Sequence, residues 1–96
     1  MMEFVELSWT DQGGGRYSLA VEYPDGFEQH RRDEIDRVIH DAGFSSQGGG
    51  RWLTSQDPNA PAAMWEQLQT LGAPLEMDTA VLPPSLMLVI ADLHFV

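Results

Sequence analysis

DQGGGRY at residues 11–17 and SQGGGRW at residues 46–52 place the same Gln-Gly-Gly-Gly-Arg-aromatic motif twice in a chain of 96 residues. Each motif stands between stretches whose side chains favour strands. Glycine adopts positive φ at no steric cost, and tight hairpin turns require positive φ. The two motifs, which we call the QGGGR loops, therefore predict two β-hairpins.

The stretches around the first QGGGR loop alternate between apolar and polar residues, over residues 3–9 and again over residues 16–23. Such alternation is typical of half-buried strands. Pro24 then ends the second strand, and apolar side chains from Phe27 to Ala42 recur at helical spacing up to Gly43. Because glycine is the favoured residue just past a helix, the pattern predicts a helix that ends at Gly43.

The predicted helix carries three of the five arginines, at positions 31, 32 and 37. Arg32 and Arg37 each stand four residues after a carboxylate, Glu28 and Asp33 respectively. Residues four apart are neighbours on a helix surface. We therefore expect intrahelical ion pairs on a solvated face.

The same order of elements returns from Phe44. A short hairpin around the second QGGGR loop is followed by DPNAP at residues 57–61, which predicts a helix start with prolines in the first turn, and Gly72 marks its end. The offset between the copies is 35 residues, from Gln12 to Gln47. We interpret residues 3–43 and 44–73 as an internal repeat of a strand-QGGGR-strand-helix unit.

The remainder of the chain is the most apolar part. Residues 75–82 alternate, residues 83–85 are Pro-Pro-Ser, and residues 86–96 are largely apolar. This pattern predicts a C-terminal hairpin over residues 75–96.

The predicted fold class is α+β, with a mainly antiparallel sheet and two helices packed on one face. The order strand-helix-strand-strand-helix-strand can be threaded through the elements, and in this it is similar to the ferredoxin-like sandwiches. The resemblance rests on element order alone, and such folds host many unrelated functions.

Composition indicates one folded domain over residues 1–96. Hydrophobic residues make up 43% and charged residues 21%, close to globular averages. Cysteine is absent, which excludes disulfides and thiolate metal sites.

The N-terminal residues lack a basic signal-peptide region, and the apolar run at residues 86–91 is too short to cross a bilayer. We expect a cytoplasmic protein without a membrane partner.

The charge of the chain favours one class of partner. The formal net charge is -10, lysine is absent, and no arginine follows residue 51. Such a charge repels nucleic acid and anionic lipid, so we expect no direct nucleic-acid binding. The leading hypothesis is a non-enzymatic acidic protein-binding module, such as a small inhibitor, immunity-type or regulatory protein that docks on a basic partner. In one version the acids imitate nucleic-acid phosphates; in the alternative they only maintain solubility.

The QGGGR loops leave a second hypothesis open. Phosphate-binding glycine loops usually lead into a helix, whereas each of these leads into a strand, so the plain interpretation is a turn. The alternative is a small anionic ligand bound between the loops, with both arginines as clamps. Its candidate residues are Gly13, Gly14, Gly15, Arg16, Gly48, Gly49, Gly50 and Arg51.

Catalytic and metal signatures are missing from the sequence. It contains no GxSxG, HExxH or dinucleotide GxGxxG motif. His30 and His40 stand ten residues apart on the predicted helix and cannot share one ion by helical spacing. We therefore expect no enzymatic activity, no metal and no cofactor.

A third hypothesis is a structural, homo-oligomeric subunit. If residues 86–96 form a strand, alternate apolar side chains project away from the helices and join outward-facing residues of other strands. Exposed apolar patches of that kind mark interfaces, so we predict a homodimer that buries this sheet face. The alternative is a cover formed by residues 73–85 of the same chain. The predicted interface residues are Phe4, Ala20, Leu86, Leu88 and Ile90.

Overall fold

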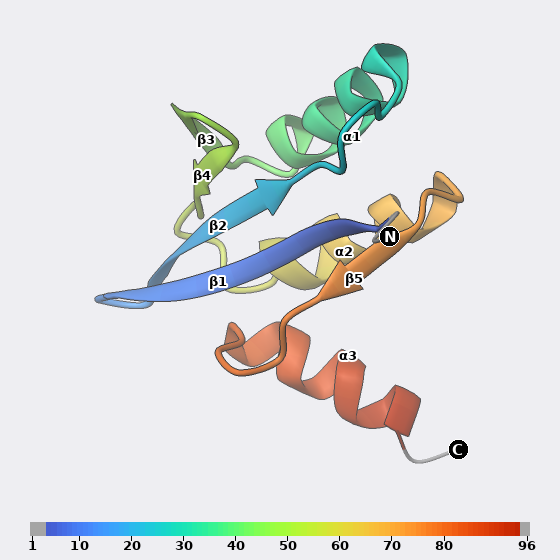
Figure 1. Cartoon of the computed structure of the whole chain (residues 1–96). Helices are drawn as coiled ribbons and strands as arrows, with labels where there is room; N and C mark the ends of the chain where they lie inside the picture. Colours follow the sequence, from blue (N-terminus) through green and yellow to red (C-terminus); the bar gives the residue numbers. More distant parts are fainter. Residues whose placement is uncertain (1–3, 95–96) are drawn as a thin grey trace.

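The computed structural model describes residues 4–94, with the side chains of residues 4–89, and is an α+β fold of five strands and three helices (Figure 1). In chain order the elements are β1 (Val5–Gly13), β2 (Arg16–Glu22), α1 (Gln29–Asp41), β3 (Ser45–Gly48), β4 (Arg51–Leu53), α2 (Ala60–Thr70), β5 (Leu75–Met77) and α3 (Pro84–His94).

The five strands form one mixed sheet in the order β3-β4-β2-β1-β5. The three pairs from β3 to β1 are antiparallel, whereas β1 and β5 are parallel. The parallel pair arises because α2 carries the chain back along the sheet, so β5 enters in the same direction as β1. The sheet is therefore not antiparallel throughout.

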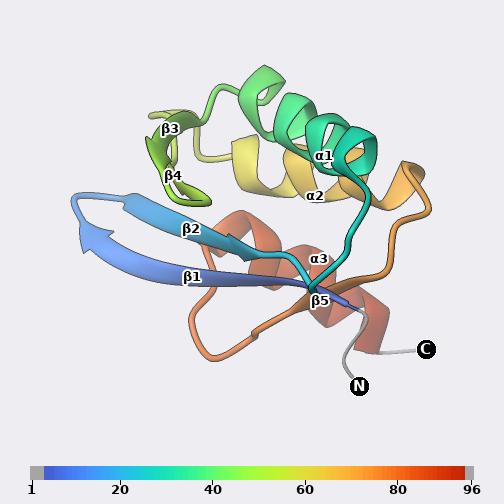
Figure 2. The ribbon, with the colours of Figure 1, turned by 45° about the horizontal axis from the view of Figure 1, so that its top comes forward.

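The molecule has two layers, and its principal extents of 35 × 34 × 21 Å reflect them. On β1 the side chains of Val5, Leu7 and Trp9 are buried, while the positions between them are exposed or half-buried. The buried positions pack with residues from all three helices in one core, and α1 and α2 lie side by side over the sheet (Figure 2). We call the sheet face without helices the open face.

The two predicted helices correspond to α1 and α2, which pack on one face of the sheet together with a third helix, α3, that was not predicted. The ends of α1 and α2 follow from local signals. Gly43 and Gly72 lie just past α1 and α2 with φ of +94° and +70°, the left-handed region that glycine enters most easily. Prolines 58 and 61 fall before and within the first turn of α2, where a missing N–H costs little.

The predicted C-terminal hairpin is wrong, because residues 84–94 form the helix α3. The amides of Leu86 and Met87 both donate to the carbonyl oxygen of Pro83, at 3.0 and 3.2 Å, and so start a helix. Leu86 is buried and Val89, almost one turn later, is half-buried against the core. A short run that is apolar at nearly every position fits both a strand and a helix, and Pro84 stands at the first helical position, where proline is tolerated. Residues 95 and 96 lie outside the described part.

The observed order of elements has one element more than the predicted order at each end of the chain. From β2 to β5 the chain runs strand-helix-strand-strand-helix-strand, but β1 is inserted between β2 and β5 in the sheet, and α3 follows β5. The ferredoxin-like classification therefore stays a prediction.

Both predicted hairpins are confirmed, with a QGGGR loop at each turn. The three glycines have φ of +82°, +63° and +80° in the first loop and +82°, +60° and +77° in the second. In both loops a side chain two residues earlier accepts from the first glycine amide: Asp11 Oδ1 from Gly13 at 2.7 Å, and Ser46 Oγ from Gly48 at 3.3 Å.

Candidate functional site: an acidic row on the open face

Three glutamates face one another across three neighbouring strands. In the sheet register, Glu6 of β1 pairs with Glu22 of β2 on one side and with Glu76 of β5 on the other. Paired residues in neighbouring strands have Cβ atoms about 4.5–5.5 Å apart and project to the same face. We call Glu22, Glu6 and Glu76 the acidic row.

The acidic row lies on the open face, because the neighbouring positions Val5, Leu7 and Val21 point into the core. Asp78 follows β5 directly and lies next to the acidic row. Its amide donates to the carbonyl oxygen of Leu7 at 2.8 Å, which extends the pairing of β5 with β1. All three glutamates and Asp78 line a polar hollow of about 470 Å³. Four carboxylates thus surround one shallow depression.

No arginine neutralises these carboxylates in the part of the chain that the structure describes. The ion pairs there join His30 to Glu28 and His40 to Asp41, on or next to α1. Arg51 is on the open face, opposite Ala20, and forms no ion pair with any carboxylate of the described residues. The negative charge of the row is therefore directed at solvent.

Two arginines of α1 contact aromatic rings, whereas the sequence predicted intrahelical ion pairs with carboxylates. Arg32 stacks on the Tyr23 ring, 4.5 Å from its centroid, and Arg31 lies 5.6 Å from the centroid of Phe27. The predicted intrahelical ion pairs are not formed among the described residues: Arg32 stacks on a ring, Glu28 pairs with His30, and Asp33 Oδ1 accepts from Gln29 Nε2 at 2.9 Å. Burial, together with the adjacent Asp36, raises the pKa of Tyr23, whose hydroxyl donates to Asp36 Oδ1 at 3.0 Å.

An apolar rim borders one end of the acidic row. Phe4 is 46% exposed, and with Tyr23 and Pro24 it lines a small cleft of about 160 Å³ that also includes Glu6 and Glu22. Carboxylates next to exposed aromatic and proline rings suit lysine and arginine side chains, which combine an apolar stem with a cationic end.

The structure does not bring the two QGGGR loops together. Gly15 directly precedes the start of β2, whereas the carbonyl oxygen of Gly50 accepts from the Val21 amide, at 2.8 Å, near the end of β2. Six residues along a strand span about 20 Å. Arg16 and Arg51 are likewise separated, since Arg51 pairs with Ala20, about 13 Å further along β2.

The predicted dimer interface does not exist as one surface. Phe4 and Ala20 lie on the open face, as expected, but Leu86 is fully buried in the core. Leu88 is 73% exposed on α3, which packs against the other face of the sheet. The side chain of Ile90 lies outside the described part. The predicted residues do not form one patch because residues 84–94 form a helix and not a strand.

Within residues 4–89, whose side chains the structure describes, no group of three or more His, Asp or Glu side chains is arranged to hold a metal ion. None of the described helices has the length and apolar content needed to cross a bilayer.

Comparisons with models of known families, with curated proteins and with solved structures gave no match. The interpretation of the function therefore depends on the geometry of the site.

Proposed function

We propose that the protein is a non-enzymatic, acidic protein-binding module that docks on a basic partner through the open face of its sheet. The observation that supports the proposal is the acidic row, in which three glutamates are paired across β2, β1 and β5 and form no ion pair with an arginine among the described residues.

The placement of these charges favours binding over simple solubility. Like charges directly opposite one another in a sheet destabilise it, whereas charges spread over helices and loops keep a protein soluble without that cost. A partner that brings lysine or arginine to the row would relieve the repulsion and gain complementary contacts. Complementary charge also speeds the encounter and rejects partners of the wrong sign.

The partner class follows from charge. An inhibitor, immunity-type or regulatory protein with this surface would bind a protein whose own site is basic, and nucleic-acid-binding proteins carry such surfaces. A second copy of this chain would instead bring one acidic row against another. We therefore propose that a different chain, and not a homodimer partner, covers the open face.

We also propose that the chain contains a duplicated hairpin-helix unit within a ferredoxin-like sandwich. The matching φ values of the two glycine triplets support the duplication, as does the side chain that accepts from the first glycine amide in each loop. Each hairpin is followed by a helix and a glycine with positive φ.

Affinity capture with matched charge variants tests the function. The row variant carries Glu6→Gln, Glu22→Gln and Glu76→Gln; the control variant carries Asp33→Asn, Glu34→Gln and Asp41→Asn, at three exposed positions of α1. Each variant loses the same three negative charges. We expect the wild type and the control to retain a basic protein from native lysate at low salt and release it at high salt, and the row variant to lose it.

Two results would contradict the proposal. Equal loss of the partner from both variants would mean that only the total charge matters. Full retention by the row variant would place the binding surface elsewhere.

A further inference from the structure

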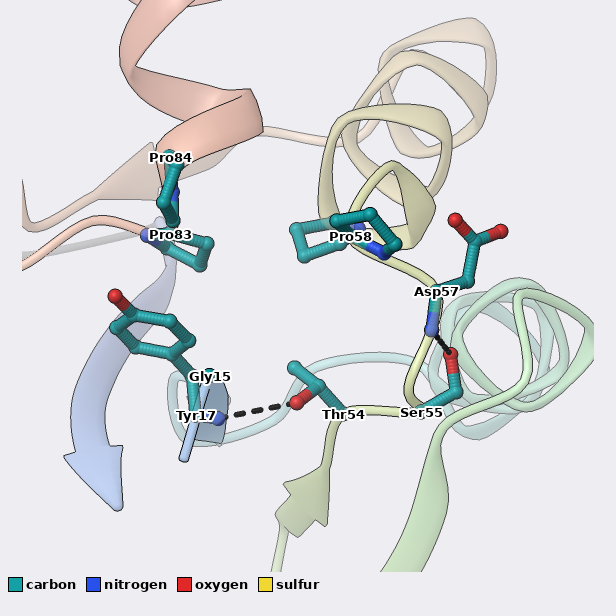
Figure 3. Close-up of a pocket in the computed structure, with 9 residues that line it drawn as sticks. Gly15, Tyr17, Thr54, Ser55, Asp57, Pro58, Pro83 and Pro84 are labelled. Carbon is teal, nitrogen blue, oxygen red and sulfur yellow. Dashed lines mark hydrogen bonds between the residues drawn. The ribbon is translucent and has the colours of Figure 1, made fainter. Parts of the chain in front are cut away.

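A second binding feature lies at the other end of β2, on the helix side of the sheet. Tyr17 and four prolines line a pocket of about 150 Å³, with Asp57 at its rim (Figure 3). We call it the proline pocket. Its residues come from the start of β2, the β4–α2 loop and the starts of α2 and α3, and the prolines are Pro58, Pro61, Pro83 and Pro84.

Hydrogen bonds hold the walls of the proline pocket in place. The Tyr17 amide donates to Thr54 Oγ1, and the Thr54 amide donates to the Tyr17 carbonyl oxygen, both at 3.0 Å. The Asp57 amide donates to Ser55 Oγ at 3.3 Å, and Asp57 Oδ1 accepts from the Asn59 amide at 2.9 Å. Asp57 Oδ2 accepts no hydrogen bond from the described residues and is free for a ligand.

The lining determines which chemistry fits. Proline rings are apolar and have no N–H, and no arginine or histidine is among the described lining residues. A pocket of about 150 Å³ is smaller than those that hold drug-sized ligands, which measure about 300–1,000 Å³, so it suits one side chain. The pocket therefore offers apolar walls and an aromatic face to a single side chain, and the Asp57 carboxylate lies at its rim, on the far side of Pro58 from Tyr17 (Figure 3).

The positions of Tyr17 and Asp57 determine how long the side chain that occupies the pocket must be. In Figure 3 the Tyr17 ring lies next to Pro83, the Pro58 ring faces them, and Asp57 stands beyond Pro58. An occupant that packs on Tyr17 and also reaches Asp57 needs a long apolar stem and a cationic end.

We propose that the proline pocket binds an arginine side chain of a partner protein. Its methylene groups pack on the Tyr17 and Pro58 rings, and its guanidinium pairs with the Asp57 carboxylate. Arginine fits better than lysine because its planar guanidinium stacks on aromatic rings and pairs with a carboxylate through two hydrogen bonds. Arginine is also among the residues that most often anchor protein interfaces in pockets.

This site is independent of the acidic row, which lies on the open face near the far end of β2. The ligand of the proline pocket and the partner of the acidic row are tested by separate experiments, and a negative result for one site does not bear on the other.

A ¹H–¹⁵N NMR titration with blocked amino acids tests the site. Nα-acetyl-arginine amide is compared with Nα-acetyl-citrulline amide, which has nearly the same shape without the charge, and with Nα-acetyl-phenylalanine amide. We expect the arginine probe to shift the amide signals of Gly15, Tyr17 and Ser55 more strongly than either of the other two.

Asp57→Asn should weaken binding of the arginine probe at these signals about threefold, the size of effect that exposed ion pairs give, and bring it to the level of citrulline. Asparagine keeps an acceptor for the Asn59 amide, so the loop should stay folded. Asp33→Asn is the matched control, because it removes the same charge at an exposed position of α1 outside the pocket, where Asp33 Oδ1 accepts from Gln29 Nε2 at 2.9 Å.

Three outcomes would overturn the proposal. They are equal shifts with citrulline, stronger shifts with the phenylalanine probe, and no shift at the pocket signals with arginine. Equal effects of Asp57→Asn and Asp33→Asn would overturn it as well.

Discussion

Leu86→Ala is expected to lower the free energy of unfolding by about 2–5 kcal/mol, the range for truncating a fully buried leucine. Leu86 is 0% exposed and packs in the same core as Leu7 and Leu68. The cavity left by the truncation would lie between α3 and the rest of the core. Urea unfolding followed by tryptophan fluorescence measures the change.

Leu88→Ala is the matched control for this prediction. Leu88 is 73% exposed, so its truncation should change stability by less than about 0.5 kcal/mol. In a strand, residues 86 and 88 would point to the same face and the two substitutions would have similar effects. Similar losses of stability would therefore contradict the helix at residues 84–94.

Gly50→Ala should be the more harmful of two equivalent glycine substitutions, with a loss of about 2–4 kcal/mol. A Cβ at position 50 would lie 2.7 Å from the carbonyl oxygen of Val21, closer than real Cβ contacts. The atom that the Cβ would meet belongs to the backbone of β2, and the Val21 amide also donates to the Gly50 carbonyl oxygen. Neither atom can move away without disturbing the contact between β2 and the second hairpin.

Gly15→Ala separates the clash from the backbone cost. Gly15 has nearly the same φ, +80° against +77°, and a Cβ there would meet no atom within 4 Å. We expect a loss of about 1–2 kcal/mol for this variant, the usual cost of a left-handed non-glycine residue. Equal melting temperatures for the two variants would show that the second QGGGR loop does not pack against β2.

Much of the fold was predictable because its signals are local. Glycine triplets mark both turns, alternation marks β1 and β2, and Gly43 and Gly72 mark the ends of α1 and α2. These features depend on φ preferences and side-chain periodicity, which a sequence displays directly.

The end of the chain was not predictable in the same way. Where nearly every residue is apolar, both strand and helix patterns can be found, and the choice depends on packing against residues distant in sequence. α3 fills the core beside α2, and this position could not be read from residues 84–94 themselves.

Two of the three glutamates of the acidic row could have been found from the sequence. Glu6 and Glu22 stand eight residues either side of Gly14, the centre of the first loop, so a symmetric hairpin pairs them. Glu76 joins the row only because α2 returns the chain so that β5 lies parallel to β1. The proline pocket likewise combines segments separated by more than sixty residues, such as Tyr17 and Pro83, and no local pattern announces it.

Zero-length carbodiimide cross-linking of the captured complex, read out by mass spectrometry, tests the docking surface most directly. This reagent joins a carboxylate to an amine in direct contact with it, and the chain contains no lysine. Apart from links to its own N-terminal amine, every link from a carboxylate of this protein must therefore lead to its partner. We expect partner lysines joined to Glu6, Glu22, Glu76 and Asp78; links concentrated on Asp33, Glu34 and Asp41 of α1 would contradict docking through the open face.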